Sequence, residues 1–316
     1  MEPPVTVLRL KSHAKVNLGL EVLGLRQDGY HELRTLFQTL ELHDDLELRA
    51  RRDGQVTLRC DHPAVPQDDS NLAVRAARDL QRLAGAQRGV DIRLVKRIPV
   101  AGGMGGGSSN AAATLIGLDR LWKLGLGPDG LQPLARRLGA DVPYFLVGGT
   151  ALGLARGDEI YPVLPQLRAH LVVVDPDRPL STPAVFRRLD ASLTPRENGT
   201  SIFRFLSSHL AGRPAFGALV NELEAAALEE APDLRDKVAA IRGILKRAGA
   251  RLLSLSGSGA TYFGLFDDAA GAVAGQAALE AAGFKAYRTR TVNLDRYRRG
   301  AWVPAAARQR RALRKR

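Results

Sequence analysis

The sequence predicts an α+β protein with two domains, and three observations support this class. The chain has 316 residues, which is long enough for two domains that each bury a core. Short segments that alternate apolar and polar residues, as half-buried strands do, are mixed with segments whose apolar residues recur at helical spacing. The two kinds of segment do not follow the regular alternation of a doubly wound parallel sheet.

The first domain is predicted at residues 1–160. In chain order we expect strands at 5–10, 16–22, 46–49 and 56–59, a helix at 72–83, a strand at 90–95, helices at 110–123 and 131–138, and a strand pair at 148–154. The second domain is predicted at residues 161–295. Its expected elements are a strand at 169–175, helices at 183–189, 216–229 and 234–248, a hairpin around 257–259, a helix at 271–282 and a strand at 286–292.

The most informative motif is PVAGGMGGGSSNAAA at residues 99–113, which has five glycines within six positions. Glycine has no Cβ, so successive backbone N–H groups can turn inward around an anion. The motif follows an expected strand and opens an expected helix, with Ser108 or Ser109 at the predicted N-cap. The positive end of that helix points toward the loop. The motif therefore predicts a phosphate-binding loop.

Two common nucleotide motifs do not match this loop. A Walker A loop requires Lys and Ser or Thr after its last glycine, whereas Ser108, Ser109 and Asn110 follow Gly107. The dinucleotide motif Gly-x-Gly-x-x-Gly fails because Ser108 stands at its third glycine. A flexible linker is the remaining alternative, and its place between a strand and an apolar helix disfavours it.

The composition restricts the setting of the protein. The single cysteine, Cys60, permits no intrachain disulfide and indicates a reducing compartment. The first residues, MEPPVTVLRL, lack the pattern of a signal peptide, and no apolar run approaches the roughly 18 residues of a membrane span. We therefore expect a cytoplasmic protein with no membrane partner.

The net charge of +13 is concentrated at the C-terminal end. Nine basic residues and no acidic residue follow from Arg296 onward, so residues 296–316 are predicted to be a basic tail. Two interpretations of this tail stay open. It is a solvated extension, or it is a contact surface for nucleic acid, the only part of the chain for which we expect such a partner.

The loop resembles the Pro-x-x-x-Gly-Leu-Gly-Ser-Ser signature of the GHMP small-molecule kinases, with Met104 in place of Leu. Four further blocks occur in matching order: HAKVN at 13–17, DGYHEL at 28–33, GADVPYF at 139–145 and SGSGAT at 256–261. Within the family, the five blocks are similar to kinases that phosphorylate a cytidine diphosphate derivative of methylerythritol, and the resemblance runs from about Lys11 to Phe266. It implies an N-terminal domain like domain 2 of ribosomal protein S5, a ferredoxin-like C-terminal domain, and an active site between them.

The resemblance also implies roles for two charged residues. Asp141 alone could be the N-cap of a short helix, and Lys15 alone could be a surface lysine. The chain has 38 Arg and 8 Lys, which suggests that a compact ammonium is needed at Lys15. In the family, the aspartate of GADVP accepts the proton of the acceptor hydroxyl, and the lysine orients that aspartate.

Binding residues are implied in the same way. Tyr30 and Phe186 would enclose a cytosine whose polar edge meets His31, and Asn17, Asp141 and Thr182 would face the rest of the acceptor, next to the loop of Gly257, Ser258 and Gly259. ATP is the expected co-substrate, with Mg²⁺ bridging its phosphates. Its expected contacts are Pro99, Val100, Ala101, Gly102, Gly103, Met104, Gly105, Gly106, Gly107, Ser108, Ser109 and Asn110, with Asn71 and Lys96 near the nucleotide.

The sequence departs from the family in one segment and leaves two other functions open. Where relatives commonly carry Gly-x-Gly followed by an acid, this chain has Ala155, Arg156, Gly157 and Asp158. One alternative is another GHMP kinase, with homoserine, mevalonate or a sugar as its acceptor. The other is a non-catalytic RNA-binding module that uses the S5-like domain and the tail. The sequence assigns no metal ligands and no oligomeric state.

Overall fold

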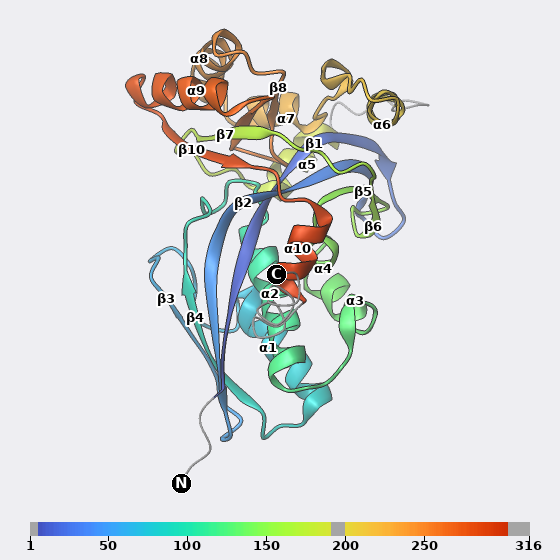
Figure 1. The fold of residues 1–316 in the computed structure, drawn as a ribbon, viewed down its shortest axis with the longest axis vertical. Helices are drawn as coiled ribbons and strands as arrows, with labels where there is room; N and C mark the ends of the chain where they lie inside the picture. Colours follow the sequence, from blue (N-terminus) through green and yellow to red (C-terminus); the bar gives the residue numbers. More distant parts are fainter. Residues whose placement is uncertain (1–5, 191–199, 303–316) are drawn as a thin grey trace, which may run out of the picture.

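A computed structural model describes residues 6–190 and 200–302 (Figure 1). The predicted two-domain α+β class is confirmed, because the strands form two separate sheets. The first sheet contains β1 (Val7–Leu25), β2 (His31–Arg51), β3 (Val56–Cys60), β4 (Gly89–Val95), β5 (Thr150–Leu154) and β6 (Glu159–Pro162). Its strand order is β3-β4-β2-β5-β6, and β1 pairs with β2. The predicted domain boundary at residue 160 falls within β6.

Helices cover one face of this first sheet. They are α1 (Leu72–Ala84), α2 (Gly106–Leu121), α3 (Gly127–Leu138) and the short α4 (Tyr144–Val147). Apolar residues of α1 and α2, such as Leu80 and Leu115, are fully buried against strand residues such as Leu48 and Ile92. Gly117 of α2 permits this close approach, because a Cβ at that position would lie 2.3 Å from the side chain of Leu48.

The second sheet has the order β10-β7-β9-β8, formed by β7 (His170–Asp175), β8 (Leu252–Leu255), β9 (Tyr262–Phe266) and β10 (Lys285–Arg290). Around it lie α5 (Thr182–Asp190), α6 (Ser201–Leu210), a 3-10 turn (Phe216–Ala218), α7 (Leu223–Glu230), α8 (Leu234–Arg247) and α9 (Ala269–Ala281). The predicted hairpin around residues 257–259 is confirmed, since β8 and β9 are antiparallel and adjacent in the chain.

The two long strands β1 and β2 belong to both domains. They pair from Val7 opposite Arg49 to Leu25 opposite His31, and they run from the lower end of the molecule into its upper part (Figure 1). Their middle residues, including Val16 and Leu36, share a buried cluster with Leu171 and Phe263 of the second sheet. From Val7 onward, the predicted strands at 5–10 and 16–22 are therefore parts of one strand.

The sequence did not predict the first half of β2. Residues 35–40 of this strand are all buried, because one side faces the helices and the other faces the second domain. A strand that is buried on both faces loses the alternation by which strands are recognised. The predicted helix at 216–229 is also wrong, since the chain there forms a 3-10 turn, an extended segment and α7. The helix α6 was not predicted.

The predicted tail begins with a helix, α10 (Leu294–Ala301), which packs on the first domain. The interpretation of the tail from Arg296 as a solvated extension is therefore wrong as far as residue 301. The Tyr297 hydroxyl donates a hydrogen bond to the Phe145 carbonyl at 2.5 Å, and the Trp302 indole donates one to the Leu146 carbonyl at 3.2 Å. Both acceptors lie in α4, so α10 holds that helix in place. Residues 303–316 lie outside the described residues.

The hydrogen bond of Tyr297 gives a first prediction. Tyr297→Phe leaves the Phe145 carbonyl without its partner in a buried position, so we expect a loss of about 1–3 kcal/mol in the free energy of unfolding. Denaturant titration of the variant and of the wild type measures this difference. Tyr161→Phe is the matched control, because that side chain is 51% exposed. Equal losses in both variants would contradict the role of Tyr297.

A second prediction concerns His13, whose ring lies 5.7 Å from that of Tyr297. Its Nδ1 lies 2.8 Å from the Leu40 carbonyl. Burial lowers the pKa of His13 from 6.5 to about 4, and His43, Lys11 and Arg296 lower this pKa further, while the Leu40 carbonyl opposes them. Between these two pH values the unfolded chain binds a proton that the folded protein does not bind. Stability contributed by neutral His13 is therefore present above pH 6.5 and is lost as the pH falls toward 4.

As the pH is lowered from about 7 to 4.5, we expect the free energy of unfolding of His13→Asn to fall by roughly 2–3 kcal/mol less than that of the wild type. Unfolding titrations at several pH values measure both profiles. His62→Asn, in the loop between β3 and α1, is the control for a histidine replacement away from His13. Parallel profiles for His13→Asn and the wild type would show that His13 does not set this dependence.

Candidate active site

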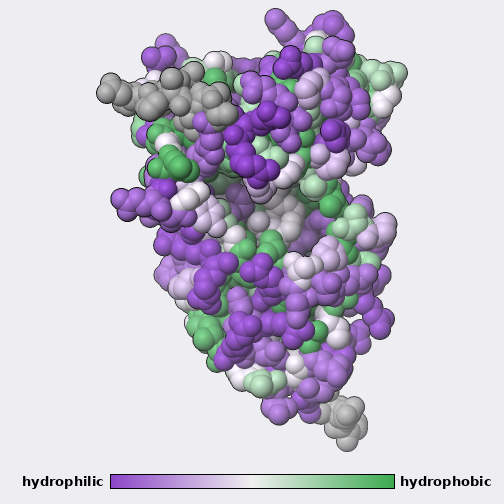
Figure 2. All heavy atoms as spheres, turned by 180° about the vertical axis from the view of Figure 1, so that it is seen from behind, coloured by the Kyte–Doolittle hydropathy of each residue, from purple (hydrophilic) through white to green (hydrophobic). Residues whose placement is uncertain are grey.

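Two cavities meet at the glycine-rich loop. A cavity of about 590 Å³ is lined by both domains, with residues from β1, β2, α5, the β5–β6 turn and the loop after β8. A second cavity of about 360 Å³ is lined by residues 99–108 and by the segment before α1. Gly103, Gly105 and Ser108 line both cavities. The molecule is visibly hollowed between its upper and lower parts (Figure 2).

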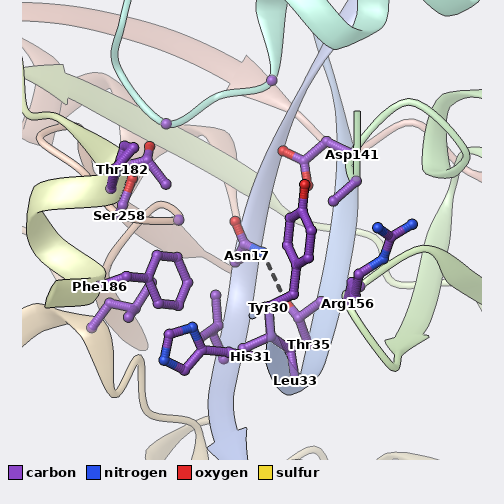
Figure 3. A pocket seen from close by; sticks show the side chains of 18 of the residues that line it. Asn17, Tyr30, His31, Leu33, Thr35, Asp141, Arg156, Thr182, Phe186 and Ser258 are labelled. Atoms are coloured by element: carbon purple, nitrogen blue, oxygen red, sulfur yellow. Dashed lines mark hydrogen bonds between the residues drawn. The ribbon is translucent and has the colours of Figure 1, made fainter. Parts of the chain in front are cut away.

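Lys15 lies at this junction and is almost fully buried. Its side chain is 3% exposed, and its Nζ lies 2.7 Å from Asn17 Oδ1 and 3.3 Å from Asp141 Oδ2. Asn17 in turn donates a hydrogen bond from Nδ2 to the Thr35 hydroxyl at 2.7 Å (Figure 3). The interpretation of Lys15 as a surface lysine is therefore wrong. The chain of contacts fixes the ammonium between β1 and the segment that carries Asp141.

Asp141 is not a helix cap. The helix α4 begins at Tyr144 with Pro143 at its N-cap, and no side chain caps it. The Asp141 carboxylate is instead 34% exposed, pairs with Lys15, and lines the larger cavity. A carboxylate held beside a buried ammonium and open to a cavity can accept a proton from a bound molecule.

The helix α2 begins within the glycine run, so the prediction of Ser108 or Ser109 as its N-cap is wrong. The N-cap is Gly105, in the left-handed conformation with φ +68°. A Cβ at this position would lie 2.9 Å from the Phe145 ring and 3.1 Å from the Lys15 side chain. Glycine is required here by both the backbone conformation and the close packing. The free N–H groups at the start of α2 therefore open directly onto the junction of the cavities.

The predicted nucleotide residues have different surroundings. Pro99 to Ser108, Asn110, Asn71 and Lys96 line the smaller cavity. Lys96 forms a buried ion pair with Asp44, and Asn71 caps α1 by accepting a hydrogen bond from the Ala73 N–H at 2.9 Å. Ser109 lines neither cavity, because its hydroxyl lies 2.8 Å from that of Ser12 in β1.

The predicted acceptor residues line the larger cavity, with one exception. Lys15, Asn17, Tyr30, His31, Asp141, Thr182, Phe186, Gly257 and Ser258 all contribute to it. The Thr182 and Ser258 hydroxyls lie 2.7 Å apart, which joins α5 to the loop after β8. Gly259 lines neither cavity and faces Leu180 and Leu255.

The aromatic side chains are paired differently from the predicted sandwich. The rings of His31 and Phe186 are stacked with their centroids 4.6 Å apart, and His31 Nε2 lies 2.7 Å from Asp190 Oδ1. The Tyr30 ring contacts the Arg156 guanidinium at 4.8 Å. Figure 3 shows Tyr30 beside Arg156 and His31 beside Phe186. Two stacked pairs, His31 with Phe186 and Tyr30 with Arg156, thus line the larger cavity.

Sequence reasoning missed three residues that build the site. The Thr35 hydroxyl accepts a hydrogen bond from the Asn17 amide, and Arg156 lines the larger cavity. Asn221 donates hydrogen bonds to the Leu255 and Gly257 carbonyls, both at 2.8 Å. Only Arg156 had a sequence signal, which was the departure from the family pattern at residues 155–158. Within the described residues, no three His, Cys, Asp or Glu side chains are grouped to hold a metal ion. No helix in this part of the chain is long and apolar enough to cross a membrane.

Comparisons with known proteins identify the family. The family models for the GHMP kinase N-terminal and C-terminal domains match residues 71–149 and 212–285. The chain is 44% identical over 285 residues to 4-diphosphocytidyl-2-C-methyl-D-erythritol kinase of Nocardia farcinica, which covers 87% of this chain and 90% of that protein. The chain belongs to the family of these kinases. The enzyme of the same name from Gloeobacter violaceus is 42% identical over 84% of the chain and 88% of its own length.

Solved structures place the fold in the same family. The crystal structure of a 4-(cytidine 5'-diphospho)-2C-methyl-D-erythritol kinase has 35% identity and a TM-score of 0.72, over 90% of this chain and 99% of that one. An L. major mevalonate kinase in complex with R-mevalonate has a TM-score of 0.70 at 17% identity, over 93% and 99% of the two chains. The second likeness concerns the fold alone, which GHMP kinases with other acceptors share.

Proposed function

We propose that this kinase transfers the γ-phosphoryl group of ATP to the 2-hydroxyl of 4-diphosphocytidyl-2-C-methyl-D-erythritol, in the non-mevalonate route to isoprenoid precursors. The observation that carries the proposal is the buried Lys15–Asp141 pair at the junction of the two cavities. The larger cavity suits an acceptor, and the smaller cavity suits a nucleotide. A cytoplasmic location follows from the proposed pathway and fits the single cysteine, Cys60.

The proposed chemistry uses two side chains. As the acceptor oxygen attacks the γ-phosphorus, its proton passes to the Asp141 carboxylate, and ADP leaves. Lys15 keeps this carboxylate oriented and stabilises negative charge on the acceptor oxygen, because its ammonium lies 3.3 Å from Asp141 Oδ2. Phosphoryl transfer has a largely dissociative transition state, so positioning and charge neutralisation supply most of the rate enhancement.

The donor phosphates are proposed to bind at the glycine loop and the first turn of α2. Backbone N–H groups there meet the smaller cavity, and Lys96 Nζ lies 3.1 Å from the position of a Cβ on Gly106. Mg²⁺ would be held by the nucleotide phosphates, by water and by the Ser108 hydroxyl, a donor set that fits the lack of a carboxylate cluster among the described residues. When bound, this ion neutralises charge on the phosphates.

The base of the acceptor is proposed to lie between Tyr30 and Phe186. His31 Nε2 lies 2.7 Å from Asp190 Oδ1, and we place the ring proton on Nε2, where it donates a hydrogen bond to Asp190 and leaves Nδ1 as the acceptor. Cytosine offers an amino group as a donor at its edge, whereas uracil offers a carbonyl oxygen there. Nδ1 therefore favours cytosine, and stacking alone would not.

The decisive experiment measures ADP release with a panel of acceptors. We expect release with the cytidine diphosphate acceptor and none above background with homoserine, mevalonate or a hexose. Release with one of these other acceptors instead would support the second function, another GHMP kinase. The family assignment favours a kinase over a non-catalytic RNA-binding module.

Asp141→Asn tests the proposed base. We expect kcat to fall by roughly 10²- to 10⁴-fold with a much smaller change in KM, because the amide keeps the shape of the side chain but cannot accept the proton. Steady-state kinetics with varied acceptor and varied ATP separate the two constants. A variant that keeps half of the wild-type kcat would disprove the assignment.

His31→Ala tests the proposed readout of the base. We expect a higher KM for the cytidine acceptor and a smaller difference from its uridine analogue, because the hydrogen-bond acceptor for the amino group is lost. Phe186→Leu serves as the comparison, since it weakens stacking for both bases. If His31→Ala raises KM equally for the two analogues, the side chain has a packing role only.

A further inference from the structure

Arg156 is a cavity residue for which neither the proposed chemistry nor the proposed base readout gives a role. It lies in the turn between β5 and β6 and lines the larger cavity together with Gly157. Its side chain is 26% exposed and forms an ion pair with Asp158 at 2.9 Å, and the Asp158 side chain is 7% exposed. On its other side, the guanidinium lies 4.8 Å from the centroid of the Tyr30 ring.

The backbone around Arg156 is held in an unusual conformation. Ala155 has a φ of +57°, which a residue with a Cβ rarely adopts, and Gly157 has a φ of +83°. The Ala155 carbonyl accepts a hydrogen bond from the Leu33 N–H at 2.6 Å, which ties the turn to the start of β2. These constraints direct the Arg156 side chain toward the segment that precedes β2, where Tyr30 lies.

Hydrogen bonds fix the backbone of Tyr30, but its ring is largely exposed. Its N–H donates to Asp28 Oδ1 at 3.1 Å, and its carbonyl accepts from the Arg26 N–H at 2.7 Å, so the turn between β1 and β2 is well braced. The residue is nevertheless 54% exposed. A ring at such a position adopts one orientation only if another group stacks on it, and binding of a base to a free ring would carry an entropic cost.

We propose that Arg156 is a positioning residue that holds the ring of Tyr30 as a stacking surface for the nucleobase of the acceptor. This inference rests on the proposed function. The planar guanidinium covers one face of the ring, and the base stacks on the other face. Figure 3 shows the two side chains next to each other on one side of the cavity, with His31 and Phe186 across from them.

A direct contact between Arg156 and the diphosphate of the acceptor is the competing role. The geometry disfavours it, because the guanidinium is already paired with Asp158 at 2.9 Å and lies 4.8 Å from the centroid of the Tyr30 ring. Arg156 acts on the base through Tyr30, so its loss affects binding of the acceptor and leaves the chemical step and ATP binding unchanged.

The experiment compares Arg156→Ala, Arg156→Lys, Tyr30→Ala and the double variant by steady-state kinetics. Arg156→Ala should raise the acceptor KM about 5- to 10-fold, with kcat and the KM of ATP within about twofold of the wild type. Arg156→Lys should show a smaller increase, because it keeps the charge but not the planar face. The double variant should have the acceptor KM of Tyr30→Ala, since Arg156 acts only through that ring.

Arg136→Ala is the matched control. It removes the other cation near Asp158 without removing the group stacked on Tyr30, so its acceptor KM should equal that of the wild type. An unchanged KM in Arg156→Ala would overturn the proposal. Multiplying effects in the double variant would also overturn it, because they would show a contact with the substrate itself. Thermal unfolding identifies any variant that has lost its fold, and Arg156→Lys then replaces Arg156→Ala in the cycle.

Calorimetric titration with cytidine diphosphate separates this inference from the proposed function. If the wild type binds cytidine diphosphate and Arg156→Ala binds it several-fold more weakly, the role of Arg156 stands even if no acceptor is phosphorylated. If both proteins bind it equally, the role of Arg156 fails even if the acceptor is phosphorylated.

Discussion

The ammonium of Lys15 is the group on which the arrangement of the site depends. A buried cation is strongly unfavourable unless it is paired and hydrogen-bonded, and Lys15 is 3% exposed. Its neighbours are Asn17 from the same strand and, from distant parts of the chain, Asp141 from the segment before α4 and Gly257, where a Cβ would lie 3.4 Å from Nζ. The backbone N–H of Lys15 also donates to the Met104 carbonyl at 3.0 Å. Four sequence blocks are thus joined at one residue.

The long strands β1 and β2 make this junction possible. Lys15 and Asn17 lie where the pairing of the strands shifts register, between His13 and Lys15 and again between Asn17 and Gly19. Such irregularities increase the local twist and redirect side chains. The same stretch packs on the second sheet, so the loop after β8 is held against the first domain. The glycine loop at one side and the acceptor cavity at the other are therefore fixed relative to one another by a continuous pair of strands.

Much of the fold and of the candidate site could be predicted from the sequence, but only where the residues that carry the pattern are close together in the chain. The glycine run at residues 99–113 predicted a tight turn before a helix, because closely spaced glycines between a strand and an apolar helix let the backbone turn there. The N-cap was misplaced, since the requirement for glycine at Gly105 comes from Phe145 and Lys15, which are distant in sequence. The first half of β2 and the helix α10 were missed for a related reason. Burial on both faces hides a strand, and the four basic residues and the tyrosine of 290–299 conceal a helix whose anchor is the carbonyl of Phe145.

The two ends of the larger cavity differ in how they are built, and this difference bears on how the site works. At the reacting end, Lys15, Asn17 and Thr35 are all buried and hydrogen-bonded, so their positions are set before any ligand binds. At the other end, Tyr30 lies on a turn and is half exposed, and its partner Arg156 comes from a second turn. Preorganised groups are what charge stabilisation in a transition state requires, whereas a stacking wall needs only its ring face in place. A rigid reacting end beside an adjustable recognition end also explains how one fold can accept different acceptors, since changes in the turns leave the buried pair of Lys15 and Asp141 undisturbed.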